Sequence, residues 1–401
     1  MPVITVAISP HDTWFLRGAR GHHDPGGGAA ESMFPPPARA VAGAVRSLLG
    51  NLTGRDWQAG AVRSGRARSA DDALFETLSL RGPYLAMDGK RHYPLPRTHL
   101  KTADGGAVRL TPAAAPSRCD LGMVRLPMVA DATQAANGLA PAEDLLVDGS
   151  ALRGLLDDTG PVRSLPGRPL KHLMEREPRL GIERDDHRKS SAEGMLYQPV
   201  HLRHTGVPFA VEVDLELRAS HKQPSADRGQ AQFMLDRASA RLEHQVIARF
   251  GAEHRVGAYA VTPPSAAVPP PVRAVGERVL IMFTTHADFG GDWKPAHFRA
   301  DSAQGADAWS GWINLRVPGA TGALETRAVH LSIISAVIGK AVRESGWDVA
   351  ENRPRPAVSL VPAGSAWFCL TSTPQTAALL HGAQLGNAIP LGRGEIAVGT
   401  W

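Results

Sequence analysis

The segment from Phe209 to Leu217 constrains the fold most strongly, because apolar and acidic side chains alternate along it. Apolar residues occupy the odd positions, and three acids stand between them, namely Glu212, Asp214 and Glu216. Successive side chains of a β-strand point to opposite faces, so this alternation predicts a strand with one buried and one polar face. Sheets of such strands with helices on one face are typical of α+β folds.

Further elements flank this strand in a recognisable order. Short apolar runs predict strands over residues 3–9, 195–204 and 255–261. Apolar positions at helical spacing predict one helix from about 35 to 50 and another over 235–250, each ended by a glycine. Strand, helix, two strands, helix, strand is the order of the ferredoxin-like fold.

A second set of predicted strands and a helix follows a proline-rich segment. Residues 262–271 hold five prolines and predict a semi-rigid linker. The elements expected beyond it are four strands at 279–285, 357–361, 366–370 and 395–400, and a helix around 375–385.

We therefore expect an α+β fold of two ferredoxin-like, RRM-like domains, at residues 1–262 and 272–401. The 41 glycines and 32 prolines exceed the usual share of these residues and predict many forced turns. They are concentrated, with arginine, in residues 53–190, so we expect that region to be a loop-rich insertion rather than core. Residues 286–326 are expected to be a second insertion.

No motif for catalysis or metal binding is present. The sequence lacks a phosphate-binding P-loop, a His-Glu-x-x-His helix and a Gly-x-Ser-x-Gly elbow. The spacing of His286, Asp288, Asp292 and His297 matches no zinc pattern. We expect no catalytic residue, no metal and no cofactor.

Two cysteines cannot form a disulfide framework, and the apolar runs are too short to span a bilayer. The N-terminus lacks the pattern of a signal peptide. We expect a soluble cytoplasmic protein without membrane contact.

Positive charge is concentrated although the net charge is only +5. Residues 1–70 hold eight arginines against four acids, and residues 163–189 hold eight basic residues against five acids. Local clusters of this kind favour a polyanionic partner. A solvated surface with mobile loops would explain the same charges.

Four segments place basic or aromatic side chains where RNA could be bound. Glycines and arginines in residues 17–28 would let the backbone approach a phosphate chain. Arg39 and Arg46 share one face of the first helix, and Tyr197, His201 and Arg203 share one face of the strand over 195–204. Arg393 stands in a glycine-rich run near the C-terminus. Ordinary solvent-facing loops and strands would explain each segment equally well.

Residues 10–20, Pro-His-Asp-Thr-Trp-Phe-Leu-Arg-Gly-Ala-Arg, carry a family resemblance. Together with residues 30–37, 42–46, 181–184, 192–197, 362–368 and 392–399, they resemble the third-subunit family of type III-B CRISPR (Cmr) effector complexes, within the RAMP superfamily. The sequence departs from the family at Gly18 and Ala19, where Asp-Gly is common, and at Ala252, where a second glycine is common.

The resemblance implies two ferredoxin-like domains and no catalytic activity. It implies a subunit that caps the 5′ handle of the guide RNA in antiviral defence, beside the large polymerase-like subunit and a RAMP backbone subunit, with target RNA contacted only indirectly. The residues expected to contact RNA are His11, Trp14, Arg17, Arg20, His22, Arg39, Arg46, Arg184, Arg188, Lys189, Met195, Tyr197, His201, Arg203 and Arg393.

Two other functions stay open. A RAMP-type endoribonuclease that processes guide-RNA precursors would need a general base, for which His11, His22 and His23 are the histidines in the expected RNA loop. A purely architectural subunit would hold the large subunit without touching RNA.

Overall fold

A computed structural model gives the fold of the chain. It describes residues 4–19, 30–57, 70–120, 122–129, 138–157, 162–185, 190–218, 225–263, 276–301, 308–318, 324–348 and 352–401. The structure is mixed α/β, with mostly antiparallel sheets and few helices. The expected linker over 262–271 lies mostly outside the described residues.

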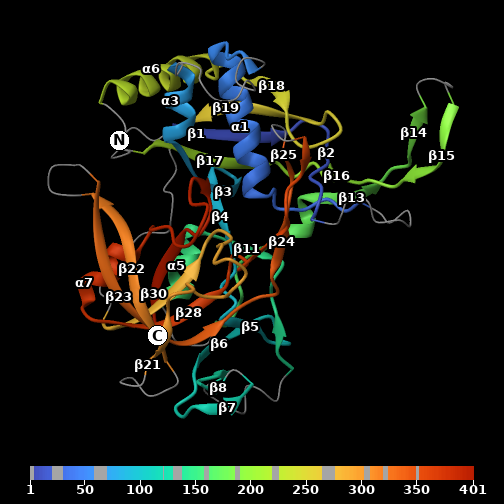
Figure 1. Ribbon diagram of the computed structural model, residues 1–401. Helices are drawn as coiled ribbons and strands as arrows, with labels where there is room; N and C mark the ends of the chain where they lie inside the picture. Colours follow the sequence, from blue (N-terminus) through green and yellow to red (C-terminus); the bar gives the residue numbers. More distant parts are fainter. Residues whose placement is uncertain are drawn as a thin grey trace.

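The first sheet is built around four antiparallel strands in the order β3–β17–β1–β19. Their bounds are Leu78–Met87, Ala210–Leu217, Ile4–Pro10 and Val256–Thr262. Strand β18 (Val246–Arg249) extends one side, and β4 (Lys90–Pro94), β11 (Leu145–Asp148) and β12 (Arg168–Pro169) extend the other. Helices α1 (Ala38–Thr53), α3 (Ala70–Thr77) and α6 (Ser225–Arg241) cover one face (Figure 1).

The alternation in β17 divides the sheet as predicted. Val211, Val213 and Leu215 are fully buried in the core that includes α1. On the opposite face the guanidinium of Arg91 donates to both carboxylate oxygens of Asp214, at 2.9 and 2.5 Å. The acidic face of the strand is therefore also buried, with its charge matched by an arginine.

The second strand of the first sheet is not the predicted one. Strand β3 pairs with β17 through Leu80↔Leu215, and residues 78–87 therefore belong to the core instead of to an insertion. Gly82 and Pro83 interrupt β3, where the register with β17 shifts at a bulge. Because glycine and proline are rare inside strands, their presence here interrupts the strand pattern, and the sequence did not predict this element.

The predicted helix over 235–250 begins and ends earlier than expected, at Ser225 and Arg241. Helix α6 ends at Arg241, and residues 246–249 form strand β18 against β19. Val246 and Ile247 are β-branched, a residue type that favours strands over helices.

The second sheet is antiparallel, in the order β21–β22–β23–β28–β20–β30. The strands run over Arg299–Asp301, Ala308–Pro318, Leu324–Val337, Ala366–Thr371, Arg278–Phe283 and Ile396–Thr400. Helix α7 (Pro374–Leu380) packs on one face. The predicted strands at 279–285, 366–370 and 395–400 are confirmed, as is a helix that begins near 375.

Two predictions for the C-terminal part of the chain, which forms the second sheet, were wrong. The region 286–326 was expected to be an insertion, but β21, β22 and the start of β23 lie in it. The strand expected at 357–361 does not join the second sheet. It is β27 (Val358–Leu360), which pairs with β24 (Val342–Glu344) in a separate ladder.

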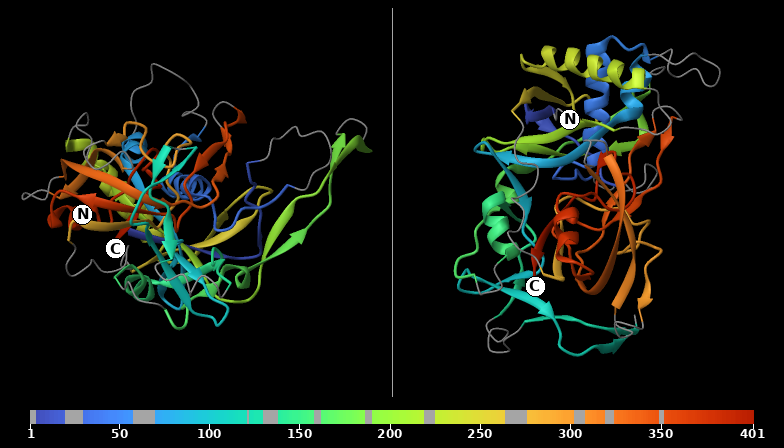
Figure 2. Two further views of the ribbon diagram at one scale, coloured as in Figure 1. Left: turned by 90° about the horizontal axis from the view of Figure 1, so that it is seen from below. Right: turned by 90° about the vertical axis from the view of Figure 1, so that its left-hand side faces the viewer.

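The two sheets form one body. Helix α5 (Gly149–Asp157) lies on the second face of the second sheet, where Leu152 and Leu156 pack with Leu280 and Phe368 (Figure 2). Strand β29 (Leu391–Gly392) adds to β3 in parallel. The buried carboxylate of Glu395 accepts hydrogen bonds across the junction from Arg81 (3.1 Å) and Tyr84 (2.5 Å).

Short strands make up the remaining layers. A four-stranded sheet holds β10 (Ala140–Pro141), β5 (His99–Lys101), β6 (Ala107–Pro112) and β9 (Pro127–Val129), with the hairpin β7 (Ser117–Cys119)–β8 (Gly122–Val124) beside it. Strands β25 (Trp347–Asp348) and β26 (Arg353–Pro354) pair alone, and the 3₁₀ turn η1 (Leu170–His172) precedes β13. In the described part of the chain, no helix combines the length and apolar character needed to cross a bilayer.

Candidate nucleic-acid interface

A three-stranded sheet brings together residues from distant segments that the sequence marks for RNA contact. It consists of β13 (Met174–Pro178), β16 (Val200–His204) and β2 (Thr13–Trp14). β2 pairs with β16 through Arg203↔Thr13, and β16 pairs with β13 through His201↔Glu177. The loop after the first strand therefore lies beside β16, as a joint RNA surface requires.

The guanidinium groups of one exposed and two half-buried arginines are held in fixed positions at this sheet. Arg203 donates to Glu177 and lies 3.5 Å from Asp12, whose other oxygen accepts from Arg255 at 3.3 Å. Arg179 contacts Glu177 at 2.6 Å. The hydrogen bond from Arg203 is the main reason that the pKa of Glu177 falls to about 2. Glu177 therefore stays ionised at neutral pH, and Glu177 and Asp12 together orient the three arginines.

Trp14, expected to contact RNA, is instead part of the core. Its ring is fully buried, 4.7 Å from Phe250 and 5.8 Å from Phe209 between ring centroids. The indole N–H donates to the carbonyl of Val256 at 3.2 Å. No face of the ring is open to a base, so the prediction for Trp14 does not fit the structure.

His201 is also buried, although it was expected on an open sheet face. Its Nε2 lies 2.9 Å from a carboxylate oxygen of Glu253, and its Nδ1 lies 3.3 Å from the hydroxyl of Thr13. The ring stacks on Phe15 at 5.0 Å. Burial lowers the pKa of His201, and both ring nitrogens are occupied. The residue joins β2, β16 and the turn at Glu253.

Arg393 lies in a buried ion-pair cluster rather than at the tip of a loop. It donates to Asp288 at 3.0 Å and to Glu344 at 2.7 Å. Glu344 also accepts the backbone N–H of Arg39 at the start of α1, at 3.1 Å. Burial and the charge of Arg393 lower the pKa of Arg39, and burial lowers that of the half-buried Arg46. Arg393 links β24 to the C-terminal segment and is not available to RNA.

The other predicted residues lie in three places. His11 and Arg17 are exposed beside β2, and Arg17 forms a bridge with Ser32. Arg184, Met195 and Tyr197 belong to the hairpin β14 (Gly181–Asp185)–β15 (Ser190–Tyr197), which projects from the body next to β13 (Figure 1). Arg20, His22, Arg188 and Lys189 lie outside the described residues.

Sequence reasoning missed Arg179, Arg255 and the exposed apolar residues at the base of the hairpin. Leu180 and Ile182 are 71% and 60% exposed. Leu180 stands between β13 and β14, and Ile182 lies in the short strand β14, so neither segment is long enough to show a period. The only sequence signal for Arg179 was its place among the eight basic residues of the stretch 163–189.

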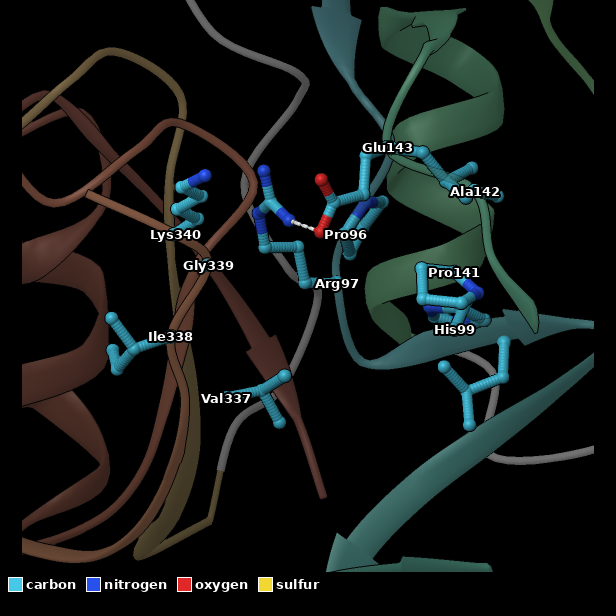
Figure 3. Close-up of a pocket in the computed structure, with 12 residues that line it drawn as sticks. Pro96, Arg97, His99, Pro141, Ala142, Glu143, Val337, Ile338, Gly339 and Lys340 are labelled. Carbon is cyan, nitrogen blue, oxygen red and sulfur yellow. Dashed lines mark hydrogen bonds and ion pairs between the residues drawn. The ribbon is translucent and has the colours of Figure 1, made fainter. Parts of the chain in front are cut away.

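A small cavity lies between the two halves of the chain but offers no catalytic arrangement. Its volume is about 180 Å³, and Arg97, His99, Glu143 and Lys340 line it together with apolar residues (Figure 3). Arg97 donates to Glu143 across it. Ligand sites usually enclose about 300–1,000 Å³, so the cavity is too small for a nucleotide. No group of three or more metal-binding side chains gathers among the described residues.

A buried histidine beside Arg393 predicts acid sensitivity. Burial, with Arg393 and Arg97 nearby, lowers the pKa of His286 to about 4, and its Nδ1 accepts the backbone N–H of Ala363 at 2.9 Å. The unfolded chain takes up this proton near pH 6.5, while the folded chain resists it, so stability falls as pH drops from about 6.5 to 4. The loss amounts to about 1.4 kcal/mol per unit of pKa depression.

Denaturant unfolding of His286→Asn between pH 4 and 7 tests this expectation, because asparagine keeps an acceptor but does not titrate. We expect a shallower pH dependence than in the wild type. The exposed His244→Asn is the matched control and should leave the slope unchanged. Equal slopes for wild type and His286→Asn would contradict the assignment.

Comparison with known proteins completes the description. A family model described as "CRISPR-associated protein (Cas_Cmr3)" matches residues 6–401. No curated protein matches. Two solved structures are similar at 15% and 14% identity, each with 91% of this chain and 86% of the other chain covered, and with TM-scores of 0.46 and 0.45. Both are cryo-EM structures of a type III-B Cmr-beta complex with cognate target RNA, the first also with AMPPnP.

Proposed function

The chain belongs to the Cas_Cmr3 family of CRISPR-associated proteins and is a subunit of a type III-B CRISPR effector, and from this premise we propose that it binds and caps the 5′ handle of the guide RNA. The observation that supports this role is the surface of the β13–β16–β2 sheet. There Arg179, Arg203 and Arg255 are held in place near the projecting hairpin, and the exposed Arg17 follows β2 in the chain.

The chemistry of this surface suits a phosphate chain. A guanidinium can donate to a carboxylate and a phosphate at once, because it carries five N–H groups in a fixed plane. The three arginines face two carboxylates, Asp12 and Glu177, and Arg17 adds a further exposed positive charge three residues after Trp14 of β2. We expect the hairpin residues Arg184, Met195 and Tyr197 to extend the contact to splayed bases.

The strand orders support two ferredoxin-like units of the RAMP type. In the first sheet the order β3–β17–β1–β19 is combined with α1 and α6, which lie between β1 and β3 and between β17 and β19 in the chain. In the second sheet, β23–β28–β20–β30 repeats that order with α7 before the last strand. Strands β21 and β22 stand in the second unit where α1 stands in the first.

We propose further that the chain bridges the large polymerase-like subunit and a RAMP backbone subunit in antiviral defence, contacts target RNA only indirectly, and has no catalytic activity. Co-purification with a tagged chain, followed by identification of the bound proteins and RNA, tests these partners. Recovery of the chain without guide RNA would contradict the handle-binding role and favour a purely architectural one.

The RNA surface is tested with Arg17→Ala/Arg203→Ala. Each lost charged hydrogen bond should weaken binding of guide RNA with its 5′ handle by about 1.5–3 kcal/mol. The slope of log affinity against log salt should fall by about 0.7 for each phosphate contact removed. Both arginines are exposed, so the melting temperature should change little.

Arg168→Ala is the matched control, because Arg168 is exposed, makes one ion pair with Asp88 and lies on another sheet edge. Guide RNA without its handle is the second control and should bind weakly to all variants. Binding of the double variant within twofold of wild type would refute the handle site.

The alternative is a RAMP-type endoribonuclease, for which the exposed His11 is the candidate base among the described residues. His201 and Glu253 resemble a base with its orienting carboxylate, but burial of the ring denies it a substrate. Incubation of precursor RNA with the protein in the absence of metal distinguishes a nuclease from a non-catalytic RNA-binding subunit. Discrete cleavage that is lost in His11→Ala would establish the nuclease.

A further inference from the structure

An exposed tryptophan stands on β22, the second strand of the second sheet counted from its β21 edge, far from the surface described above. Trp312 in β22 is 61% exposed, whereas its neighbour Ile313 and the next odd residue, Leu315, are buried. The indole lies on the opposite face of the strand from that core and takes no part in its packing. A large aromatic ring left in water at an outward position of a strand offers a flat apolar face that a ligand can cover.

The ring is held in a defined position. Trp312 stands opposite His330 of β23, with ring centroids 5.2 Å apart and planes at 65°. The backbone carbonyl of Trp312 contacts Nε2 of His297 at 2.7 Å. β23 pairs with β22 along this stretch, whereas β21 pairs only with residues 308–310, so at Trp312 the strand is held by β23 on one side and by His297 on the other. The indole is therefore a preorganised platform rather than a mobile side chain.

The residues around the ring on the same face are polar or basic. Ser310 lies two positions before Trp312, and its hydroxyl contacts that of Ser332 at 2.7 Å. Arg299 of β21 stands opposite Ser310, and Arg278 of β20 lies on the same row beyond β28. Arg278 lies over the ring of Trp401, 5.1 Å from its centroid, and Arg299 donates to the backbone carbonyl of Ala296 at 2.6 Å, so neither charge is matched by a carboxylate in these contacts. Asp301, one row further out, is the nearest carboxylate on that face by register.

We propose that this outer face of β21, β22 and β23 binds single-stranded RNA, with Trp312 as the platform on which one base stacks. Bases of single-stranded RNA stack on aromatic side chains, while arginine and hydroxyl groups contact phosphates and 2′-hydroxyls. A protein partner would favour a continuous apolar patch, but the neighbours of Trp312 are hydroxyl, imidazole and guanidinium groups. The charge of the face favours a polyanion.

This contact is separate from the proposed handle site. β22 and β23 lie on the side of the molecule opposite to β13–β16 in two views (Figures 1 and 2). An RNA strand bound here therefore belongs to another part of the guide or to a second RNA. The inference does not depend on handle capping.

The test measures binding of a fluorescent, mixed-sequence, single-stranded RNA of 12 nucleotides to the full chain. Trp312→Ala should weaken binding roughly 5- to 150-fold, the range for the loss of one base–aromatic stack. Trp312→Phe should keep most of the affinity. Trp347→Ala, which removes another exposed tryptophan, is the matched control and should bind as wild type. The same losses should appear in the Arg17→Ala/Arg203→Ala background, which separates this site from the handle site.

Two outcomes overturn the proposal. One is binding of Trp312→Ala within twofold of wild type. The other is loss of a subunit of the effector complex from Trp312→Ala with RNA affinity unchanged, which would make the face a protein contact. If Trp312→Ala does not fold, crosslinking of 4-thiouridine RNA to the wild-type chain decides. Crosslinks within residues 308–315 support the site, and their absence there refutes it.

Discussion

Replacing Arg393 with alanine is expected to destabilise the chain by about 3–5 kcal/mol, because it leaves two buried carboxylates without a counter-charge. Arg393 is about 1% exposed, and its two partners, Asp288 and Glu344, are also largely buried. Glu344 additionally orders the start of α1 through Arg39, so the damage should extend to both halves of the molecule. Denaturant unfolding at neutral pH measures the loss.

Two further variants make the Arg393 experiment specific. Arg327→Ala removes an exposed arginine 3.9 Å from Glu325 and should change stability by no more than about 1 kcal/mol. Arg393→Met combined with Asp288→Asn and Glu344→Gln removes the charges together and should recover part of the stability. A stable Arg393→Ala chain that had lost only RNA affinity would show that this arginine reaches RNA after all.

The glycine-rich C-terminal run explains why sequence reasoning assigned Arg393 to RNA. Glycines beside an arginine suggested a cradle for a polyanion. In the structure Gly392 has φ = 94°, and a Cβ there would lie 2.1 Å from the carbonyl oxygen of Gly82. The glycine permits β29 to lie against β3. The partners of Arg393 are 105 and 49 residues away in the chain, so no local pattern could reveal them.

Elements with a clean local period were predictable, and interrupted ones were not. The alternation of β17 and the apolar runs of β1, β20 and β30 located four strands of the two sheets. Strand β3 is broken by Gly82 and Pro83, and it could be recognised only from its pairing with β17. Pairing across more than 120 residues is a property of the fold and leaves no mark on either segment.

The same limit applies to the candidate RNA surface. Arg17 follows β2 and Arg203 lies in β16, and these two strands pair. The sequence singled out both segments. It could not separate exposed from buried members of one segment. His201 and Arg203 share a face of β16, yet the turn at Glu253 covers the first and leaves the second open.

Trp14→Ala is expected to cost about 3–5 kcal/mol of stability, the usual range for truncating a buried aromatic residue. Trp14 is fully buried between Phe209 and Phe250, and its removal would leave a cavity and an unpaired carbonyl at Val256. RNA affinity, measured on the fraction that remains folded, should stay within about twofold of wild type. Thermal melting and RNA binding on the same samples provide both readouts.

Trp312→Ala should behave in the opposite way, which makes the two tryptophans controls for each other. The indole of Trp312 is largely in water, so its loss should leave the melting temperature nearly unchanged and reduce RNA affinity. Burial, rather than residue type or position in a basic region, then decides which aromatic residue serves the fold and which serves RNA. A stable Trp14→Ala chain with weakened RNA binding would reverse that assignment, because it would require an indole open to a base.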